Sequence, residues 1–241
     1  MGPGPSSVAG PDRAGPGRAG RDSLSLLKCR LQGAHGPGRP GPRGHPTGEP
    51  KSVTTTADSP PDLQPTLKGQ RVWLRPLTAA DFEGCYRAAA DPATWAQHPD
   101  RLRYQEAIFR ARLFDSAVTC GGALVVLNRS DDQIIGATRY YDWNPADREI
   151  AIGYSYLAHD HWGTGANTEV KRLMLNHVFQ WADVVWFHVA EDNIRSRRAV
   201  EKLGAHSVRK LAQAVDGRPF VQCNYRLTRC GWTGRVNGQT H

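Results

Sequence analysis

A short segment with two glycines is the first place in this sequence where chemistry is expected. Residues 161–169 read HWGTGANTE, with Gly163 and Gly165 one residue apart. An apolar run, IAIGYSYLA, precedes the segment, and a polar run able to start a helix follows it. Glycines let a ligand approach the backbone, and the free N–H groups at a helix N-terminus attract anions. The segment therefore predicts a site for phosphate or pyrophosphate.

Two familiar phosphate motifs do not fit this segment. A P-loop has Lys and Ser or Thr after its second glycine, where this chain has Ala166 and Asn167. A dinucleotide fingerprint needs a third glycine where Thr168 stands, although Glu191 lies where the ribose acid would be. A Rossmann half would also not follow an antiparallel meander. The alternative that stays open is a plain strand-to-helix turn.

The flanking residues predict the elements that position the segment. Residues 149–158 predict a strand, and residues 183–190 predict another that is buried on both faces. Between them, apolar residues at helical spacing predict one face of an amphipathic helix, namely Val170, Leu173, Met174, His177, Val178 and Trp181. Strand, helix and strand form a parallel βαβ crossover. The helix IRSRRAVEKLG follows, and Gly204 ends it.

The rest of the folded part predicts mainly antiparallel strands. Residues 78–81 form a Thr-x-x-Asp capping box that starts a helix, and residues 104–117 predict a second, weaker helix. The predicted strands, joined in part by short turns, are 71–77, 122–128, 134–143 and a closing hairpin around DGRP. We expect an α/β (α+β) fold with a mixed, mostly antiparallel central sheet and a parallel βαβ core flanked by helices.

Composition divides the chain into three parts. Residues 1–66 hold 12 of the 17 prolines and 12 of the 25 glycines, and none of the 20 aromatic residues. Such a segment cannot bury enough apolar surface to offset its ordering entropy, which predicts a disordered tail. Neither a membrane span nor a secretory signal is expected in it. Residues 67–232 are expected to fold as one domain, and 233–241 to form a flexible C-terminal tail.

Charge and cysteine usage exclude some classes of function. The net charge of +8 has no Lys/Arg block, and it suits an anionic ligand, an acidic partner or solubility alone. The five cysteines form no CxxC pair, and the histidines are scattered, so no metal site is expected. The odd number and wide spacing of the cysteines favour a reduced, cytoplasmic protein.

Four stretches, in order, resemble the GCN5-related N-acetyltransferase (GNAT) superfamily, and most closely its RimJ/RimL-like branch. They are LKGQRVWLRPLTAADFEGCY, EIAIGYSYLAHDHWGTGANTEVKRLML, NIRSRRAVEKLGA and the closing hairpin. The resemblance spans about residues 67–230. It implies an acetyl-CoA-dependent N-acetyltransferase, whose acceptor is a primary amine of a small molecule or a protein N-terminus.

The resemblance also implies which residues hold acetyl-CoA. The pyrophosphate would lie on the backbone N–H groups of the glycine segment, which is Trp162, Gly163, Thr164, Gly165, Ala166 and Asn167. Pantetheine would pair with the backbone of Tyr156 and Leu157 like an added strand. Asn193 would hydrogen-bond the pantetheine arm, although an N-cap of the next helix explains this residue equally well. The family's loop often carries Lys or Arg where Thr164 stands, so one cation near phosphate is missing.

The catalytic residues expected of the family are partly absent. Ala151 stands where relatives often have a Glu base, so Glu149, two residues earlier on the same strand face, is the candidate base through water. Val200 stands where many relatives have a Tyr acid, and Ser196 is the candidate donor to the leaving thiolate. A strand N–H near Tyr156 is the candidate oxyanion donor.

Each of these residues also has a structural explanation. Glu149 could be a solvated charge at a strand end, and Ser196 could be a small residue packed on a helix face. Tyr154, Tyr156 and His188 are secondary candidates for substrate contact or proton relay, although each such residue is more often a core or sheet-face aromatic.

Two other classes of function compete with the enzyme. The missing Glu and Tyr are compatible with a non-catalytic sensor or scaffold that binds acyl-CoA. The arginines of NIRSRRAVEKLG could meet nucleic acid, but no second helix lies at helix-turn-helix distance before them, and we expect no nucleic acid or membrane partner. A homodimer is possible.

Overall fold

A computed structural model describes residues 61–237 of the chain, and the expectation of a disordered tail over 1–60 lies outside the described residues. Eight strands form one sheet in the order β1-β2-β3-β4-β5-β6-β8-β7. Only β5 and β6 pair in parallel among these neighbours, and the other pairs are antiparallel. The strands are β1 (Leu67–Lys68), β2 (Val72–Pro76), β3 (Ala123–Asn128), β4 (Ile134–Asn144), β5 (Glu149–Leu157), β6 (Val184–Ala190), β7 (His206–Val215) and β8 (Arg218–Thr228).

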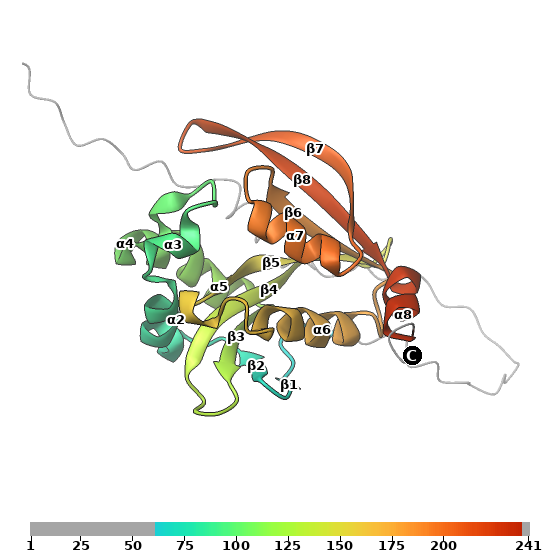
Figure 1. Ribbon diagram of the computed structural model, residues 1–241, viewed down its shortest axis with the longest axis horizontal. Helices are drawn as coiled ribbons and strands as arrows, with labels where there is room; N and C mark the ends of the chain where they lie inside the picture. Colours follow the sequence, from blue (N-terminus) through green and yellow to red (C-terminus); the bar gives the residue numbers. More distant parts are fainter. Residues whose placement is uncertain (1–60, 238–241) are drawn as a thin grey trace, which may run out of the picture.

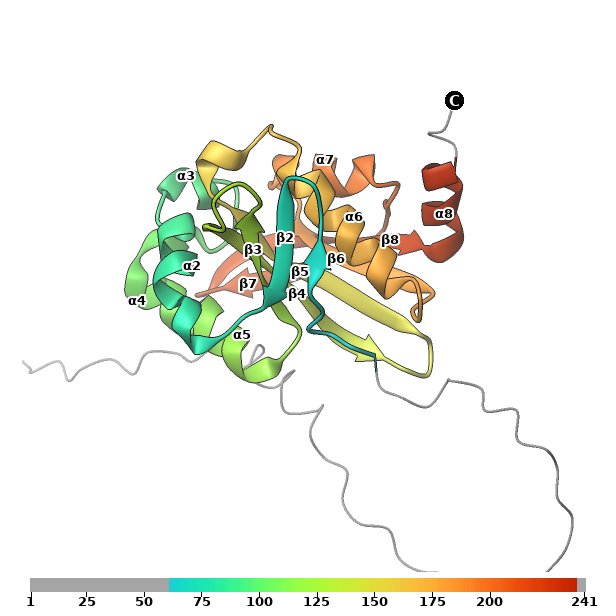
Figure 2. The same cartoon turned by 90° about the horizontal axis from the view of Figure 1, so that it is seen from below.

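Helices cover both faces of this sheet (Figures 1 and 2). One face is covered by a group of short helices, which are α2 (Phe82–Ala89), α3 (Pro92–Trp95), α4 (Glu106–Phe109), the π-helical turn η3 (Arg110–Phe114) and α5 (Asp115–Cys120). The other face is covered by α6 (Ala166–Val178), α7 (Ile194–Lys202) and α8 (Arg229–Asn237). The 3-10 turns are η1 (Ala79–Asp81), η2 (Arg101–Tyr104) and η4 (His159–His161). The expected mixed α/β fold with a mostly antiparallel sheet and a parallel βαβ core is confirmed.

Each face of the sheet has its own apolar core. Leu74, Ile150, Met174 and Val185 belong to the core under α6 and α7. Phe82, Phe109 and Phe114 belong to the core under the α2–α5 group, where their rings contact one another. The strands of the centre of the sheet are therefore buried on both sides, which explains why they read as apolar runs rather than as alternating ones.

Side-chain caps fix the entry into the first helices. The capping box expected at 78–81 is present, because the Asp81 carboxylate accepts the Thr78 N–H at 2.8 Å and the hydroxyl of Thr78 contacts it at 2.9 Å. Arg75 forms a bidentate ion pair with the same carboxylate. The Arg75 guanidinium and Thr78 hold the pKa of Asp81 below its ordinary value, against the opposing and largest effect of burial. A strand residue thus anchors the start of α2.

The helix predicted after the glycine segment buries a slightly different face from the one expected. Val170, Met174 and Val178 are buried as predicted, but Leu173 and His177 lie at the edge of the contact, and Lys171 and Leu175 are buried in their place. His177 instead contacts the Asp62 carbonyl at 2.8 Å. The buried face of the helix is therefore displaced by about one residue from the predicted face. The hydrophobic pattern did not indicate that Lys171 would be buried.

The folded part extends beyond the boundaries expected from composition. Pro65 is buried and Leu63 packs against the core under α6, so ordered structure begins before residue 67. At the other end, α8 continues through Asn237, past the boundary expected at 232, and Trp232 is buried in the same core. The closing hairpin turns at Asp216 and Gly217, whose φ angles of 49° and 74° are those of a two-residue primed turn.

Other features of residues 61–237 bear on the function classes considered above. No helix among them combines the length and apolar character needed to cross a bilayer. The same residues bring together no group of three or more His, Cys, Asp or Glu side chains that could hold a metal ion. Cys85, Cys223 and Cys230 are free thiols. The expectation of a reduced chain stays a prediction.

Candidate active site

The parallel pair of strands comes apart along its length. β5 and β6 pair only over residues 149–151 and 184–186. β5 nevertheless continues to Leu157, and β6 continues to Ala190 while it stays paired with β8 on its other edge. Beyond the split, the edge of β5 that faces β6 has backbone groups that an extended ligand could use as a strand would.

Strand alternation indicates which backbone groups of β5 face this open edge. The Ala158 N–H donates to the Ile135 carbonyl at 2.8 Å, so the preceding residue, Leu157, directs its backbone groups away from β4. The Leu157 carbonyl accepts a hydrogen bond from the Trp162 indole at 3.0 Å. By the same alternation Tyr156 directs its backbone towards β4, and Ser155 shares the open edge with Leu157.

An irregular backbone lies next to the split. Tyr154 has a φ of 51°, and the pairing of β4 with β5 shifts register between Ala137 and Arg139. The left-handed conformation of a residue with a side chain costs about 1 kcal/mol or more, so the surrounding structure must enforce it. Bulges of this kind change the direction of side chains near functional sites. Here the bulge lies just beyond the part of β5 that pairs with β6.

The glycine segment has the open backbone that an anion requires. Gly163 and Gly165 have φ angles of 75° and 87°, which only glycine adopts readily. No atom lies within 4 Å of where a Gly163 Cβ would be. α6 begins at Ala166 immediately after the second glycine, so its first N–H groups and dipole point into the loop. The Thr164 hydroxyl donates to the His161 carbonyl at 2.9 Å, which holds the turn.

A cation that was missed in the sequence lies beside this loop. The Arg71 guanidinium donates to the Thr164 carbonyl at 3.4 Å. Arg71, Arg129 and His161 also line a cleft of about 370 Å³. The Glu169 carboxylate accepts the backbone N–H groups of Gln70, Arg71 and Val72 at 2.7, 2.8 and 3.1 Å, which fixes the position of this arginine. Arg71 therefore supplies, from a distant part of the chain, the cation that Thr164 does not.

Asn193 caps the following helix, as its structural explanation required. Its side-chain oxygen accepts the Ser196 N–H at 3.1 Å, and the residue is buried. Next to it, the Arg195 guanidinium lies 3.7 Å from the centre of the Trp162 ring and donates to the Thr94 carbonyl at 2.8 Å. The first turn of α7, the glycine segment and α3 thus meet at the open ends of β5 and β6. Ser196 is half-buried in this turn.

The structure places the other two candidate catalytic residues away from the open edge. Glu149 lies in the part of β5 that is still paired with β6, and its carboxylate accepts a hydrogen bond from the Trp186 indole at 2.9 Å. The Tyr156 side chain is buried under α2, where its hydroxyl donates to the Cys85 carbonyl at 3.2 Å. Burial raises the pKa of Tyr156 well above its ordinary value. Neither side chain reaches the open edge, and both instead hold β5 in place.

A tyrosine and a histidine meet across the split. The Tyr141 hydroxyl lies 2.9 Å from Nδ1 of His188, joining β4 to the separated part of β6. The Tyr141 ring lies over Gly153, where a Cβ would come within 2.9 Å of it, so the absent side chain makes this crossing possible. Burial raises the pKa of Tyr141, which keeps its hydroxyl protonated. Of the secondary candidates, His188 lies at the split, and Tyr154 contacts Tyr141 beside it, with the two ring centres 5.0 Å apart.

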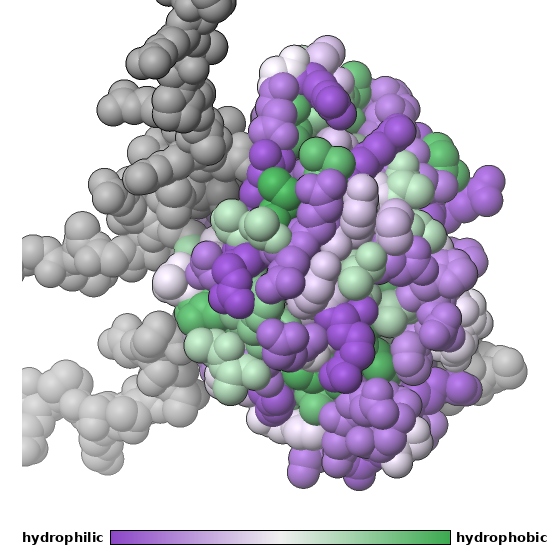
Figure 3. Space-filling view, turned by 90° about the vertical axis from the view of Figure 1, so that its left-hand side faces the viewer, coloured by the Kyte–Doolittle hydropathy of each residue, from purple (hydrophilic) through white to green (hydrophobic). Residues whose placement is uncertain are grey.

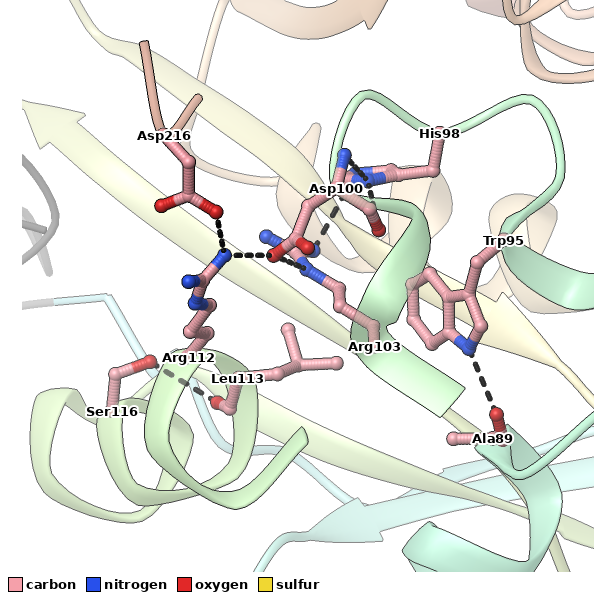
Figure 4. A network of polar contacts seen from close by, with 9 residues as sticks. All are labelled: Ala89, Trp95, His98, Asp100, Arg103, Arg112, Leu113, Ser116 and Asp216. Carbon is pink, nitrogen blue, oxygen red and sulfur yellow. Dashed lines mark hydrogen bonds and ion pairs between the residues drawn. The ribbon is translucent and has the colours of Figure 1, made fainter. Parts of the chain in front are cut away.

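Ion pairs link the short helices of the α2–α5 group to the tip of the β7–β8 hairpin (Figure 4). Arg112 lies 2.6 Å from the Asp216 carboxylate and 3.4 Å from that of Asp100, which also pairs with Arg103 at 3.1 Å. His98 lies against Asp100, and burial keeps its pKa well below the ordinary value. The hairpin tip therefore closes over the face that carries the α2–α5 group. Figure 3 shows this end of the molecule as largely hydrophilic, with apolar residues in small separate groups.

A buried lysine on the opposite face was also missed in the sequence. Lys171 of α6 donates to the Ser155 hydroxyl at 2.5 Å and to the Thr138 hydroxyl at 3.4 Å. Burial lowers its pKa from 10.5 to about 7. Ser155 itself is exposed, so its hydroxyl connects the buried lysine to the open edge of β5.

Known proteins share this fold. Residues 71–206 match the acetyltransferase (GNAT) domain family. Among solved structures, a GCN5-related N-acetyltransferase from Brucella melitensis is 20% identical, with a TM-score of 0.64 over 70% of this chain and 81% of that one. A GNAT-family acetyltransferase from Bacillus anthracis is 15% identical, with a TM-score of 0.58 over 68% and 98% of the two chains.

A third similar structure contains CoA and spermine. Spermidine N-acetyltransferase from Vibrio cholerae, in complex with CoA and spermine, is 15% identical, with a TM-score of 0.55 over 68% of this chain and 99% of that one. At these identities the structural likeness supports the fold alone. The domain match covers more than half of the chain, and it includes the strand split, the glycine segment and the start of α7. The chain belongs to the GNAT acetyltransferase family.

Proposed function

We propose that the protein transfers the acetyl group of acetyl-CoA to a primary amine by direct attack in a ternary complex. The observation that carries the proposal is the split between β5 and β6 with the glycine segment at its open end. Backbone groups of Ser155 and Leu157 fit a pantetheine arm, and the Gly163–Gly165 turn with Arg71 fits a pyrophosphate. Membership of the RimJ/RimL-like branch, a cytoplasmic location and a homodimer stay predictions.

The residues of this chain suggest how the reaction is supported. Acetyl-CoA supplies an activated thioester, and its acetyl end would lie beside the strand split. An N–H at the open edge of β5, from Ser155 or Leu157, is the proposed donor to the oxyanion. Ser196, in the first turn of α7, is the proposed donor to the thiolate.

The proton of the attacking amine needs an acceptor. We assign this part to the Tyr141–His188 pair, because it spans the split and contacts Tyr154, which packs against the core under the α2–α5 group. We take this face of the sheet as the acceptor face. Glu149, acting through water, stays the alternative. Its hydrogen bond to Trp186 favours a role in holding β5 against β6 at the closed end of the split.

The proposal is tested by product analysis with the full-length protein. Acetyl-CoA is mixed with a panel of amino acids, amino amides, peptides and polyamines, and mass spectrometry detects acetylated products while a thiol reagent measures released CoA. Matched product and thiol are expected for at least one class. Binding of acetyl-CoA with no product from any class would favour a non-catalytic sensor, for which the Ala151 and Val200 substitutions in the family pattern already argue.

A further inference from the structure

One buried cation on the acceptor face has no ion-pair partner among residues 61–237. Arg139 of β4 is 4% exposed, and no hydrogen-bond partner for its Nε or Nη1 exists among residues 61–237. Its guanidinium lies 3.8 Å from the centre of the Tyr154 ring, which is an attraction but not a neutralising partner. A buried guanidinium cannot give up its proton, and a buried charge without a partner is strongly unfavourable. The arginine is therefore suited to an anion that comes from outside the chain.

The unpartnered nitrogens belong to a side chain that lines a cavity. Arg139, Tyr154 and Tyr156 form its sheet side, and apolar side chains of the α2–α5 group, including Phe109, Leu113 and Phe114, form its other side. No Asp or Glu of residues 61–237 is among the lining residues. The space is about 20 Å³, which holds roughly one water molecule. The space admits one oxygen atom and no bulky group, and its accessible lining is almost wholly apolar, so the guanidinium must turn for Nε and Nη1 to meet a carboxylate there.

The cavity lies beside the place where acetyl transfer is proposed. Arg139 pairs with Gly153 on β5, two residues beyond Ala151, where the pairing with β6 ends. The ring under its guanidinium belongs to Tyr154, the residue whose positive φ forms the bulge. Tyr154 in turn contacts Tyr141, the partner of His188. An anion held by Arg139 would thus lie next to the proposed proton acceptor.

We propose that Arg139 binds a carboxylate of the acceptor, so that the enzyme prefers amines that carry a carboxylate a few bonds from the reacting nitrogen. This inference rests on the acetyl transfer proposed above. It selects against polyamines, which would bring a second positive charge to a buried cation. The carboxylate could belong to a free amino acid or to an acidic residue at the N-terminus of a peptide, and both present the same group to the guanidinium.

The test compares matched acceptors with and without the carboxylate. Full-length protein is assayed with leucine against leucinamide, with Asp-Ala-Ala-amide against Asn-Ala-Ala-amide, and with spermidine. In at least one pair, the carboxylate form is expected to have a kcat/KM about 10- to 100-fold higher, as for a charged hydrogen bond formed away from bulk water. The pair that shows the preference identifies the source of the carboxylate.

Variants assign that preference to the arginine. Arg139→Gln is expected to bring the carboxylate-to-amide ratio close to one, with Arg139→Lys in between and the control Arg87→Gln unchanged. Melting curves provide a second measurement: 4-methylpentanoate, which lacks the amine, should stabilise the native protein more than 4-methylpentanamide does, and should lose this advantage in Arg139→Gln.

The outcomes separate this inference from the proposed function. Equal rates for acids and amides in the native protein, a preference for spermidine, or a ratio that Arg139→Gln leaves unchanged would overturn the carboxylate assignment while acetyl transfer stands. The same results would indicate that water satisfies the guanidinium. Failure of every acceptor would instead count against the proposed function. If Arg139→Gln does not fold, Arg139→Lys and the melting curves of the native protein still decide.

Discussion

Each face of the sheet has one buried cation next to β4 and β5 within residues 61–237, and the two cations have different surroundings. Under α6, Lys171 contacts the hydroxyls of Thr138 and Ser155, and burial lowers its pKa to about 7, so it can give up its charge. Under the α2–α5 group, Arg139 has an aromatic ring and a small cavity around it and no ion pair among residues 61–237. The cation on the α6 face has hydrogen-bond partners within the protein, whereas the cation on the other face can still take a partner from a ligand.

The same contrast holds for the two ligands that the proposal brings together. The cofactor side consists mostly of backbone, with the Gly163–Gly165 turn, the start of α6 and the open edge of β5. The acceptor side consists of side chains from distant parts of the chain. A backbone site can be shared by a whole family, while side chains set the preference of one member, so changes on the two sides should affect different quantities.

The largest effect expected is on stability, at Lys171. The unfolded chain holds this proton up to about pH 10.5, whereas the folded chain releases it above about pH 7. Because the unfolded state binds more protons in that window, stability should rise with pH by about 1 kcal/mol per unit between pH 7 and 10.

Lys171→Met should remove that slope and raise the melting temperature most at pH 7, measured by calorimetry at several pH values. The control is Lys202→Met, which changes an exposed lysine. A slope that survives in Lys171→Met would show that the lysine keeps its proton in the fold, and the contrast with Arg139 would disappear.

On the acceptor side, His188→Gln is expected to lower kcat by about 100-fold, the lower end of what a positioned base contributes. The affinity for acetyl-CoA is expected to change much less than kcat, because the proposed contacts to pyrophosphate and pantetheine come mainly from backbone groups. Steady-state kinetics and a binding titration measure the two quantities. Glu149→Gln is the matched comparison and should change kcat much less. A larger loss with Glu149→Gln, together with a lost acidic limb of the pH–rate profile, would transfer the role of base to Glu149.

On the cofactor side, Gly165→Val is expected to weaken acetyl-CoA binding by about tenfold, since a side chain at a φ of 87° forces the loop to change shape. Gly217→Val is the matched control, because it places the same strain at a φ of 74° in the β7–β8 turn. Both variants should lose stability, and only the first should lose affinity. Equal affinities, measured by calorimetry, would mean that the loop backbone does not hold the cofactor.

The smallest effect expected is at Arg71, which lies beside the loop and is exposed. Arg71→Gln should reduce the affinity for acetyl-CoA by about threefold at low salt, as for one screened charge pair, and the difference should shrink as salt is added. Arg87→Gln on α2 should show neither change. A loss that does not depend on salt would indicate that the arginine positions the Thr164 carbonyl rather than attracting phosphate.

The parts of the fold that follow local rules were predictable from the sequence. The capping box at Thr78, the strand before the glycine segment and the hairpin turn at Asp216 and Gly217 each depend on residues close together in the chain. The short elements β1 and α3 were missed, because two- and four-residue elements carry almost no periodic signal. The break of the second predicted helix into α4, η3 and α5 was missed as well.

The site was predictable only where backbone forms it. The glycine spacing indicated the loop, but Arg71 reaches Thr164 from 93 residues away, and no local pattern marks such a pair. Lys171 and Arg139 were not identified, because the apolar residues around them set the prediction for each segment. Tyr141 gave no signal, since its role depends on the missing side chain of Gly153 and on a strand that joins the sheet later.

The measurement that tests the central claim most directly is a calorimetric titration of the full-length protein with acetyl-CoA, with NADH and ATP as controls. The structure predicts saturable binding of one acetyl-CoA per chain and much weaker binding of either control. No acetyl-CoA binding to folded protein would mean that HWGTGANTE is only a turn between a strand and a helix, and the proposed acetyl transfer would fall with it.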